Sequence, residues 1–303
     1  MRSVVGISFS QLELASRWRA ELADRLAGCV VEYADRLAPG DVDVLVVGNP
    51  PGSGLRRYSS LRFVQSTWAG VDQLVEGGPS VPIARMVAPA LASLMAEFVH
   101  AAVLMVHRGF PEYRRRQSEH EWRPLPPVET SRRRVGVLGF GELGRPCAVA
   151  LAAAGFDVAA WARRSRPAEV PVLVGTDGFS ELLSRSEIVA NLLPLTPATV
   201  GILDQRAFAR MPRGSTLINV ARGGHVVETD LLRALDGGHL SDAILDVFAE
   251  EPLPPEHAYW SHPRVTVLPH VAAPSDPEDL APDVAANIER FLSGRRPRFL
   301  VSG

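Results

Sequence analysis

The sequence contains no lysine, because all 32 of its basic residues are arginine. Chemistry that depends on a lysine Schiff base is therefore excluded. The formal net charge is −2, which gives the chain no overall attraction to nucleic acid or to an anionic membrane. We accordingly interpret the arginine runs at 114–116 and 132–134 as solvated surface, and we expect neither nucleic-acid nor membrane partners.

Cysteine is scarce, with only Cys29 and Cys147 far apart in the chain. This spacing forms neither a disulfide framework nor a metal site, and no His/Cys/carboxylate cluster indicates a metal. The sequence shows no N-terminal charged-then-apolar segment and no uninterrupted apolar run of about 18 residues. These absences predict a cytoplasmic protein without a metal. A length of 303 residues is compatible with roughly two domains of about 150 residues each.

Strands alternate with helices along the chain, a pattern that predicts parallel sheets with helical crossovers. A polar, proline-rich stretch at 122–127 reads as a linker between two such series. The first series predicts strands over 4–7, 42–47 and 61–65, with helices over 11–26 and 88–106. The second predicts strands over 134–138, 157–161, 188–192, 216–220, 243–247 and 265–268, with helices over 144–154, 229–235 and 279–293.

A glycine-rich turn follows the strand predicted at 134–138, with the sequence Gly139-Phe140-Gly141-Glu142-Leu143-Gly144. A GxGxxG motif alone is a weak signal, but a preceding strand and a following helix are the context it requires. The glycines permit a tight turn, close approach of a pyrophosphate and close helix packing. The helix N-terminus then offers N–H groups to the phosphates. This motif predicts a dinucleotide site.

The end of the next strand indicates which dinucleotide is preferred. NAD enzymes usually place an acid there to hold the ribose 2′-hydroxyl, whereas this chain has Ala162 followed by Arg163 and Arg164. No carboxylate would repel a 2′-phosphate, and the two guanidinium groups can pair with it. We therefore predict NADP as cofactor, with NADPH preferred over NADH.

Three later segments place an arginine, a glutamate and a histidine at strand ends of the same half, where ligands bind in doubly wound sheets. Reduction of a ketone by hydride transfer builds negative charge on oxygen, so His270 is predicted to donate the proton. Glu251 would orient the imidazole ring and favour its charged form. Arg222 would bind the substrate carboxylate or polarise its carbonyl.

Taken together, these motifs resemble the D-isomer-specific 2-hydroxyacid dehydrogenase family, most closely its glyoxylate/hydroxypyruvate reductase A branch. The resemblance extends over nearly the whole chain. It rests on the GxGxxG turn and on the segments 83–87, 122–127, 191–197, 219–223, 246–248, 251–255 and 269–273. It implies that Arg222, Glu251 and His270 form the catalytic set, with Glu251 rather than Glu250 because Glu251 directly precedes Pro252.

The resemblance also implies an architecture and a set of contacts. We expect two Rossmann-like, doubly wound domains separated by an active-site cleft: a substrate domain of residues 1–98 and 273–303, and a cofactor domain of residues 99–272. The chain would form a homodimer. The expected substrate contacts are Trp68, Ala69, Gly70 and Arg222. The expected cofactor contacts are Gly139, Gly141, Glu142, Leu143, Gly144, Arg163, Arg164, Leu193, Pro194, Val220, Ala221 and Asp246.

Two features of the first domain allow more than one interpretation. Trp68 either narrows the substrate pocket or packs in the core, and Asp72 is better explained as a helix N-cap than as a functional acid.

Two alternative functions remain open. The first is a non-catalytic dinucleotide sensor on the same fold, since fold alone does not determine function. The second is an enzyme of the same family with another substrate, such as formate, phosphite or an arylpyruvate.

Overall fold

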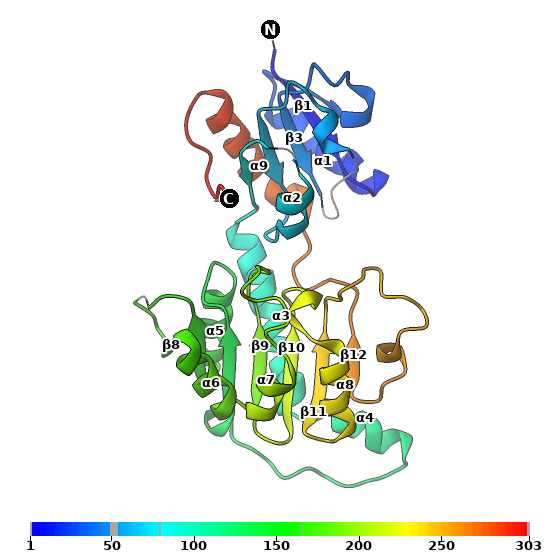
Figure 1. Ribbon diagram of the computed structural model, residues 1–303, viewed down its shortest axis with the longest axis vertical. Helices are drawn as coiled ribbons and strands as arrows, with labels where there is room; N and C mark the ends of the chain where they lie inside the picture. The colour runs from blue at the N-terminus through cyan, green and yellow to red at the C-terminus, as the bar shows by residue number, and fades with distance from the viewer. Residues whose placement is uncertain (1, 49–53, 79, 166, 302–303) are drawn as a thin grey trace. The chain divides into compact units, whose positions relative to one another are not determined.

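The computed structural model describes residues 2–48, 54–78, 80–165 and 167–301, and the chain divides into two compact units (Figure 1). The first unit combines Met1–Leu91 with Ser275–Gly303, and the second is the continuous segment Ala92–Pro274. The boundary between the two units after Leu91 falls within helix α3 (Pro89–His107). The boundary expected after residue 98 falls within the same helix.

The first unit is built on a parallel sheet with strand order β2-β1-β3-β4-β5. Every residue of the central strand β3 (Val44–Val47) is buried, as expected for an apolar strand covered on both faces. The other elements are β1 (Val4–Ser8), α1 (Leu12–Arg25), β2 (Val30–Tyr33), a 3-10 turn (Ala34–Arg36), a second 3-10 turn (Leu55–Arg57), β4 (Phe63–Ser66), α2 (Asp72–Gly77), β5 (Ile83–Ala84) and α9 (Pro277–Leu292).

Helix α9, near the end of the chain, packs back onto this first unit. The ring of Phe291 stacks on Phe63 with 4.7 Å between the ring centroids. The helix was predicted to begin at residue 279 but begins at Pro277. The earlier start has a physical cause: a proline fits the first helical turn, and Asp276 caps it by accepting the N–H of Glu278 at 2.9 Å.

The second unit contains a seven-stranded parallel sheet with order β12-β11-β10-β9-β6-β7-β8. The strand order reverses between β6 and β9, which is where dinucleotides bind in folds of this kind. Its strands are β6 (Arg134–Leu138), β7 (Asp157–Ala162), β8 (Val172–Val174), β9 (Ile188–Asn191), β10 (Ser215–Asn219), β11 (Leu240–Leu245) and β12 (Val265–Val267). Its helices are α4 (Phe110–Ser118), α5 (Gly144–Ala153), α6 (Gly175–Arg185), α7 (Gln205–Arg210) and α8 (Glu228–Asp236), with 3-10 turns at Thr130–Arg132, Gly223–His225 and Ala258–Trp260.

Two apolar clusters form the core of this unit. One joins α3 and α5 to one face of the sheet, and the other joins α6, α7 and α8 to the opposite face. Both clusters include residues of β6, β7, β9, β10 and β11. Figure 1 shows the helices α6, α7 and α8 in front of the sheet. Strands β9 and β10 are buried along their whole length, because helices cover both faces. The prediction of two doubly wound, parallel α/β domains is confirmed.

Candidate active site

The glycine-rich turn lies at the point where the strand order of the second unit reverses. Gly139 follows β6 with φ +99°, and a Cβ there would lie 2.8 Å from the carbonyl oxygen of Leu192. A Cβ on Gly144 would collide with the Gly139 carbonyl, whereas one on Gly141 would have no atom within 4 Å. The turn is therefore closed by packing on one side and open at Gly141. Its backbone fits the approach of a dinucleotide pyrophosphate at the start of α5.

The arginine pair follows directly after β7. Ala162 is the last residue of that strand and is buried, whereas Arg163 and Arg164 are exposed. Within the described ranges, neither guanidinium group pairs with a carboxylate. Both charges therefore remain available to an anionic ligand, as the predicted binding of a 2′-phosphate requires.

The other predicted cofactor contacts lie in the glycine-rich turn after β6 and in the turns that follow β9, β10 and β11. Leu193, Val220 and Ala221 are buried. Pro194 and Glu142 are exposed, and Leu143 is half-buried. Because parallel strands bring their carboxyl ends to one edge of the sheet, these residues share the edge that carries the glycine-rich turn.

His270 and Glu251 are in direct contact. The Nδ1 atom of His270 lies 2.8 Å from Oε2 of Glu251, and Oε1 of Glu251 accepts the N–H of Phe248 at 2.9 Å. Burial raises the pKa of Glu251, but the bonds from His270 and Phe248 and the charges of His270 and Arg222 outweigh it, so the pKa lies below its usual value. The carboxylate thus stays ionised beside the imidazole.

Arg222 lies in the turn that leads from β10 to the 3-10 turn Gly223–His225. Its Nη1 donates to the carbonyl of Ala221 at 2.6 Å, and its charge contributes to the lowered pKa of Glu251. A Cβ on Gly223 would collide with the main chain at Phe248, so the turn of Arg222 packs closely against the segment that leads to Glu251. The three predicted catalytic residues therefore lie in one region of the second unit.

Asp246 has a contact that the sequence did not predict. It is fully buried, and its two oxygens accept the N–H groups of Val271 and Ala272 at 2.8 and 2.9 Å. Burial raises the pKa of Asp246 above its usual value, although these two hydrogen bonds act in the opposite direction. The residue expected to contact the cofactor thus holds the chain directly after His270.

The predicted substrate loop belongs to the first unit. The N–H of Trp68 donates to Oγ of Ser66 at 3.0 Å, and its carbonyl accepts the N–H of Met86 at 2.8 Å. In the described part of the chain, the N–H groups of Ala69 and Gly70 make no hydrogen bond. These two groups remain available as hydrogen-bond donors, as the predicted binding of a substrate carboxylate requires.

The expected N-cap at Asp72 is wrong by one position. Val71 occupies the cap, and Asp72 is the first residue of α2. Val71 has no side chain that could accept a hydrogen bond, so the carboxylate of Asp72 stands in the first helical turn, where a negative charge is favoured.

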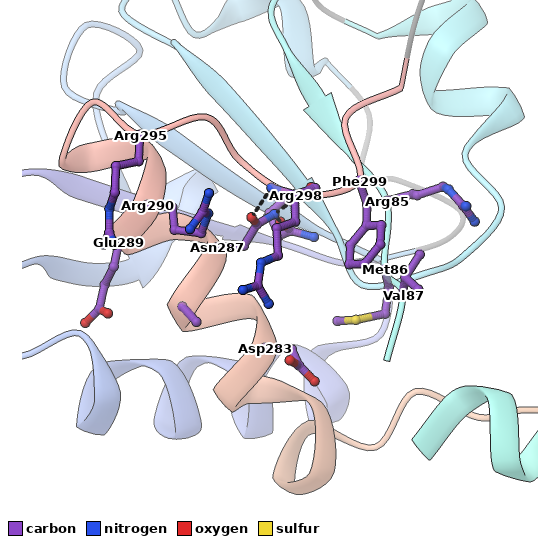
Figure 2. Close-up of a pocket in the computed structure, with 12 residues that line it drawn as sticks. Arg85, Met86, Val87, Asp283, Asn287, Glu289, Arg290, Arg295, Arg298 and Phe299 are labelled. Atoms are coloured by element: carbon purple, nitrogen blue, oxygen red, sulfur yellow. Dashed lines mark hydrogen bonds between the residues drawn. The ribbon is translucent and has the colours of Figure 1, made fainter. Parts of the chain in front are cut away.

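A cavity of about 230 Å³ lies elsewhere in the first unit. Figure 2 shows Met86, Arg298 and Phe299 around it, with Asp283 on α9. The cavity contains none of the predicted site residues. It adjoins the substrate loop through Met86, whose N–H bonds to Trp68.

The arrangement is matched by proteins of known family. Residues 100–272 match the D-isomer specific 2-hydroxyacid dehydrogenase, NAD binding domain. The chain is 39% identical over 299 residues, 95% of each chain, to the glyoxylate/hydroxypyruvate reductase A of Serratia proteamaculans (strain 568).

Two solved structures share the fold over almost the whole chain. One is a D-isomer specific 2-hydroxyacid dehydrogenase from Xanthobacter autotrophicus Py2 in complex with NADPH and MES, with a TM-score of 0.91, 36% identity, and 99% and 98% of the two chains covered. The other is an NADPH-dependent glyoxylate/hydroxypyruvate reductase from Sinorhizobium meliloti in complex with NADP and sulfate, with a TM-score of 0.89, 36% identity and the same coverage. The chain belongs to the D-isomer specific 2-hydroxyacid dehydrogenase family and is an oxidoreductase.

Proposed function

We propose that this enzyme reduces a small 2-oxoacid, of the glyoxylate or hydroxypyruvate type, to the D-2-hydroxyacid with NADPH. The observation that carries the proposal is the hydrogen bond between His270 and Glu251, on the edge of the sheet that also bears the glycine-rich turn. The names of the similar proteins from Serratia and Sinorhizobium support the substrate class.

His270 is the proposed proton donor. When NADPH is bound, it supplies the hydride. Nδ1 of His270 faces Glu251, so Nε2 is the nitrogen that gives a proton to the substrate oxygen as negative charge builds there. The Glu251 carboxylate accepts the hydrogen bond of Nδ1 and so fixes the ring orientation before the transfer.

Substrate binding is assigned to two sets of donors. Arg222 offers a fixed fork of N–H groups that binds the carboxylate or polarises the ketone oxygen. Ala69 and Gly70 offer main-chain N–H groups to the carboxylate, and Trp68 narrows the space for the substrate side chain. Together they favour a small acid with a carbonyl next to its carboxylate.

The NADPH preference is proposed from the end of β7. Ala162 carries no charge where an acid would select NAD. Arg163 and Arg164 are exposed and lack acidic partners in the described ranges, which supports charge-assisted bonds to a 2′-phosphate. Relatives solved with NADPH and NADP support the same preference.

We further propose that the enzyme is a cytoplasmic homodimer. Helix α3 is long and apolar enough to cross a membrane, judged by length and composition alone. Only 28% of its most apolar 18-residue stretch is buried within the chain. Exposed large apolar side chains also occur in α3 and in the segment after it, a composition typical of protein interfaces. They are Leu104 in α3, Phe110 and Tyr113 in α4, and the fully exposed Trp122. A second copy of the chain would cover this surface, and the free thiols of Cys29 and Cys147 suit a reducing compartment.

Light scattering tests the dimer. Phe110→Glu combined with Trp122→Arg should convert a dimer to a folded monomer. A wild-type protein that is monomeric, or that sediments with lipid vesicles, would contradict this part of the proposal.

The activity test follows NADPH oxidation with glyoxylate, hydroxypyruvate, pyruvate and phenylpyruvate, with NADH in parallel. We expect turnover of the two smaller acids, a higher kcat/KM with NADPH, and D-glycerate as the product from hydroxypyruvate on chiral analysis. Tight NADPH binding without turnover of any acid would instead favour the dinucleotide sensor. Turnover of phenylpyruvate alone would assign a bulkier substrate.

A further inference from the structure

We propose that Asn191 and Asn219 form a buried positioning pair that ties the main chain of Arg222 to the turn beside the glycine-rich loop. Nothing in the sequence motifs assigned either side chain a role. The inference deepens the proposed function, because it rests on the assignment of Arg222 as a substrate-binding residue.

The two asparagines sit side by side at the edge of the sheet. Asn191 is the last residue of β9 and Asn219 the last residue of β10, and the two are register partners. Their exposed fractions are 0% and 1%. A buried amide without hydrogen-bond partners is strongly unfavourable, so two of them at adjacent strand ends require a set of bonds that satisfies both.

Two main-chain donors decide how the amide groups are oriented. Oδ1 of Asn191 accepts the N–H of Leu193 at 3.2 Å, and Oδ1 of Asn219 accepts the N–H of Ala221 at 3.3 Å. An amide nitrogen at either position would face another donor. Each side chain therefore has only one orientation that satisfies its neighbours.

The remaining amide nitrogens then complete a chain of bonds. Nδ2 of Asn191 donates to Oδ1 of Asn219 at 3.0 Å, and Nδ2 of Asn219 donates to the carbonyl of Arg222 at 3.0 Å. The ring Nδ1 of His225 lies 3.1 Å from the same carbonyl. Asn219 thus holds the chain at the N–H of Ala221 and at the carbonyl of Arg222, which limits where the guanidinium group can point.

The other end of the pair reaches the predicted cofactor turn. Asn191 fixes the N–H of Leu193, and the neighbouring carbonyl of Leu192 is the group against which Gly139 packs. The same pair of amides therefore shapes the wall beside the glycine-rich turn and the backbone of Arg222. We expect Asn219 to act mainly on catalysis and Asn191 mainly on cofactor binding.

A double-mutant cycle between Asn219 and Arg222 separates positioning from general stability. Asn219→Ala should lower kcat/KM for the 2-oxoacid by about 10- to 100-fold. If Asn219 acts through Arg222, the same change should have no further effect in an Arg222→Ala background. If Asn219→Ala lowered kcat/KM by the same factor in the wild-type and Arg222→Ala backgrounds, the proposal would be overturned.

A matched control removes an equally buried side-chain bond away from the site. Ser186 lies just before the opposite end of β9, and its Oγ donates to the carbonyl of Leu182 at 2.6 Å. Ser186→Ala should lower Tm without changing kcat. A similar loss of Tm with unchanged kcat and unchanged NADPH affinity in Asn219→Ala would reduce Asn219 to a structural residue and overturn the inference.

A second variant keeps the test valid if Asn219→Ala does not fold. Asn191→Ser should raise the NADPH Kd, measured by nucleotide fluorescence, several-fold more than Ser186→Ala does. An unchanged Kd would contradict the assignment of Asn191. If Arg222→Ala itself retains full turnover, the proposed role of Arg222 fails, and this inference fails with it. If Arg222→Ala is impaired and Asn219→Ala matches the control, only this inference fails.

Discussion

The Nδ1 atom of His270 lies 2.8 Å from Oε2 of Glu251 although the main chain of His270 has a φ of +55°. A positive φ is uncommon outside glycine and persists only where the surroundings hold it. The two N–H groups that follow His270 are both bound by Asp246. The pair is thus sustained by a buried carboxylate as well as by its own hydrogen bond.

Removal of either partner of the pair should reduce turnover. We expect His270→Gln to lower kcat by about 10²–10⁴-fold, because a positioned acid contributes that much, with little change in NADPH affinity. Glu251→Gln should have a smaller effect of the same kind. The adjacent, exposed Glu250 supplies the control, since Glu250→Gln should leave kcat unchanged. If Glu250→Gln and Glu251→Gln lowered kcat equally, the loss of kcat would be due to the change in net charge.

The lowered pKa of Glu251 predicts how stability depends on pH. A carboxyl group with a lowered pKa in the folded state contributes stability above its unfolded pKa, which is about 4.3. That contribution is lost as the pH falls through the folded value. The Tm difference between wild type and Glu251→Gln should therefore be constant above about pH 5 and shrink in more acidic buffer. A difference that grows on acidification would contradict the direction of the shift.

Asp246 offers a test between two roles. Asn at this position keeps only one acceptor oxygen, so either Val271 or Ala272 loses its partner. If Asp246 positions His270, Asp246→Asn should lower kcat by about 10-fold, equivalent to about 1.4 kcal/mol, at an unchanged NADPH Kd. A raised Kd with unchanged kcat would support the cofactor contact that the sequence predicted. Stopped-flow kinetics together with a binding titration distinguish the two results.

The arginine pair after β7 should determine cofactor choice. Arg163→Ser combined with Arg164→Ser removes the charges expected to hold the 2′-phosphate, and a charge-assisted bond contributes about 1.5–3 kcal/mol. We expect kcat/KM with NADPH to fall about 10- to 100-fold, while kcat/KM with NADH changes little. Arg210→Ser, which removes an exposed arginine at the end of α7, is a suitable control. Parallel losses with both cofactors would refute the assignment.

The two thiols should differ in reactivity. Cys147 is fully buried in α5, and burial raises its pKa to about 12. Burial also raises the pKa of the partly exposed Cys29. Since the thiolate is the reactive form, iodoacetamide at mildly alkaline pH should label Cys29 slowly and Cys147 only after unfolding. Peptide mass spectrometry reads out both sites, and early labelling of Cys147 would show that its environment opens in the native state.

Strongly apolar elements of the fold were predictable, because their patterns are local. The strand predicted at 134–138 coincides with β6 (Arg134–Leu138). Helix α6 was missed because Gly175 and Gly178 are poor helix formers and its cap, Val174, gives no starting signal. Strand β5 contains only two residues and was too short for any periodic pattern.

The contacts within the candidate site were predictable to the extent that they lie in short motifs. The contact between Glu251 and His270 follows from two such motifs. The N–H of Val271 donates to Asp246, 25 positions away in the chain. Because the donor is a main-chain group, the identity of residue 271 does not reveal this bond in the sequence. Asn191 and Asn219 did give a signal, since each is a polar residue that ends an apolar strand.

The two ends of the chain complete a single unit, whereas the second unit is one continuous segment. During synthesis, Ala92–Pro274 leaves the ribosome whole and can fold at once, since domains generally fold as units. The first sheet, by contrast, lacks α9 until the segment after Pro274 has been synthesised, and the ring of Phe63 has no Phe291 to stack on before then. The second unit can therefore fold before the first unit is complete, although the strands of the first unit are synthesised earlier.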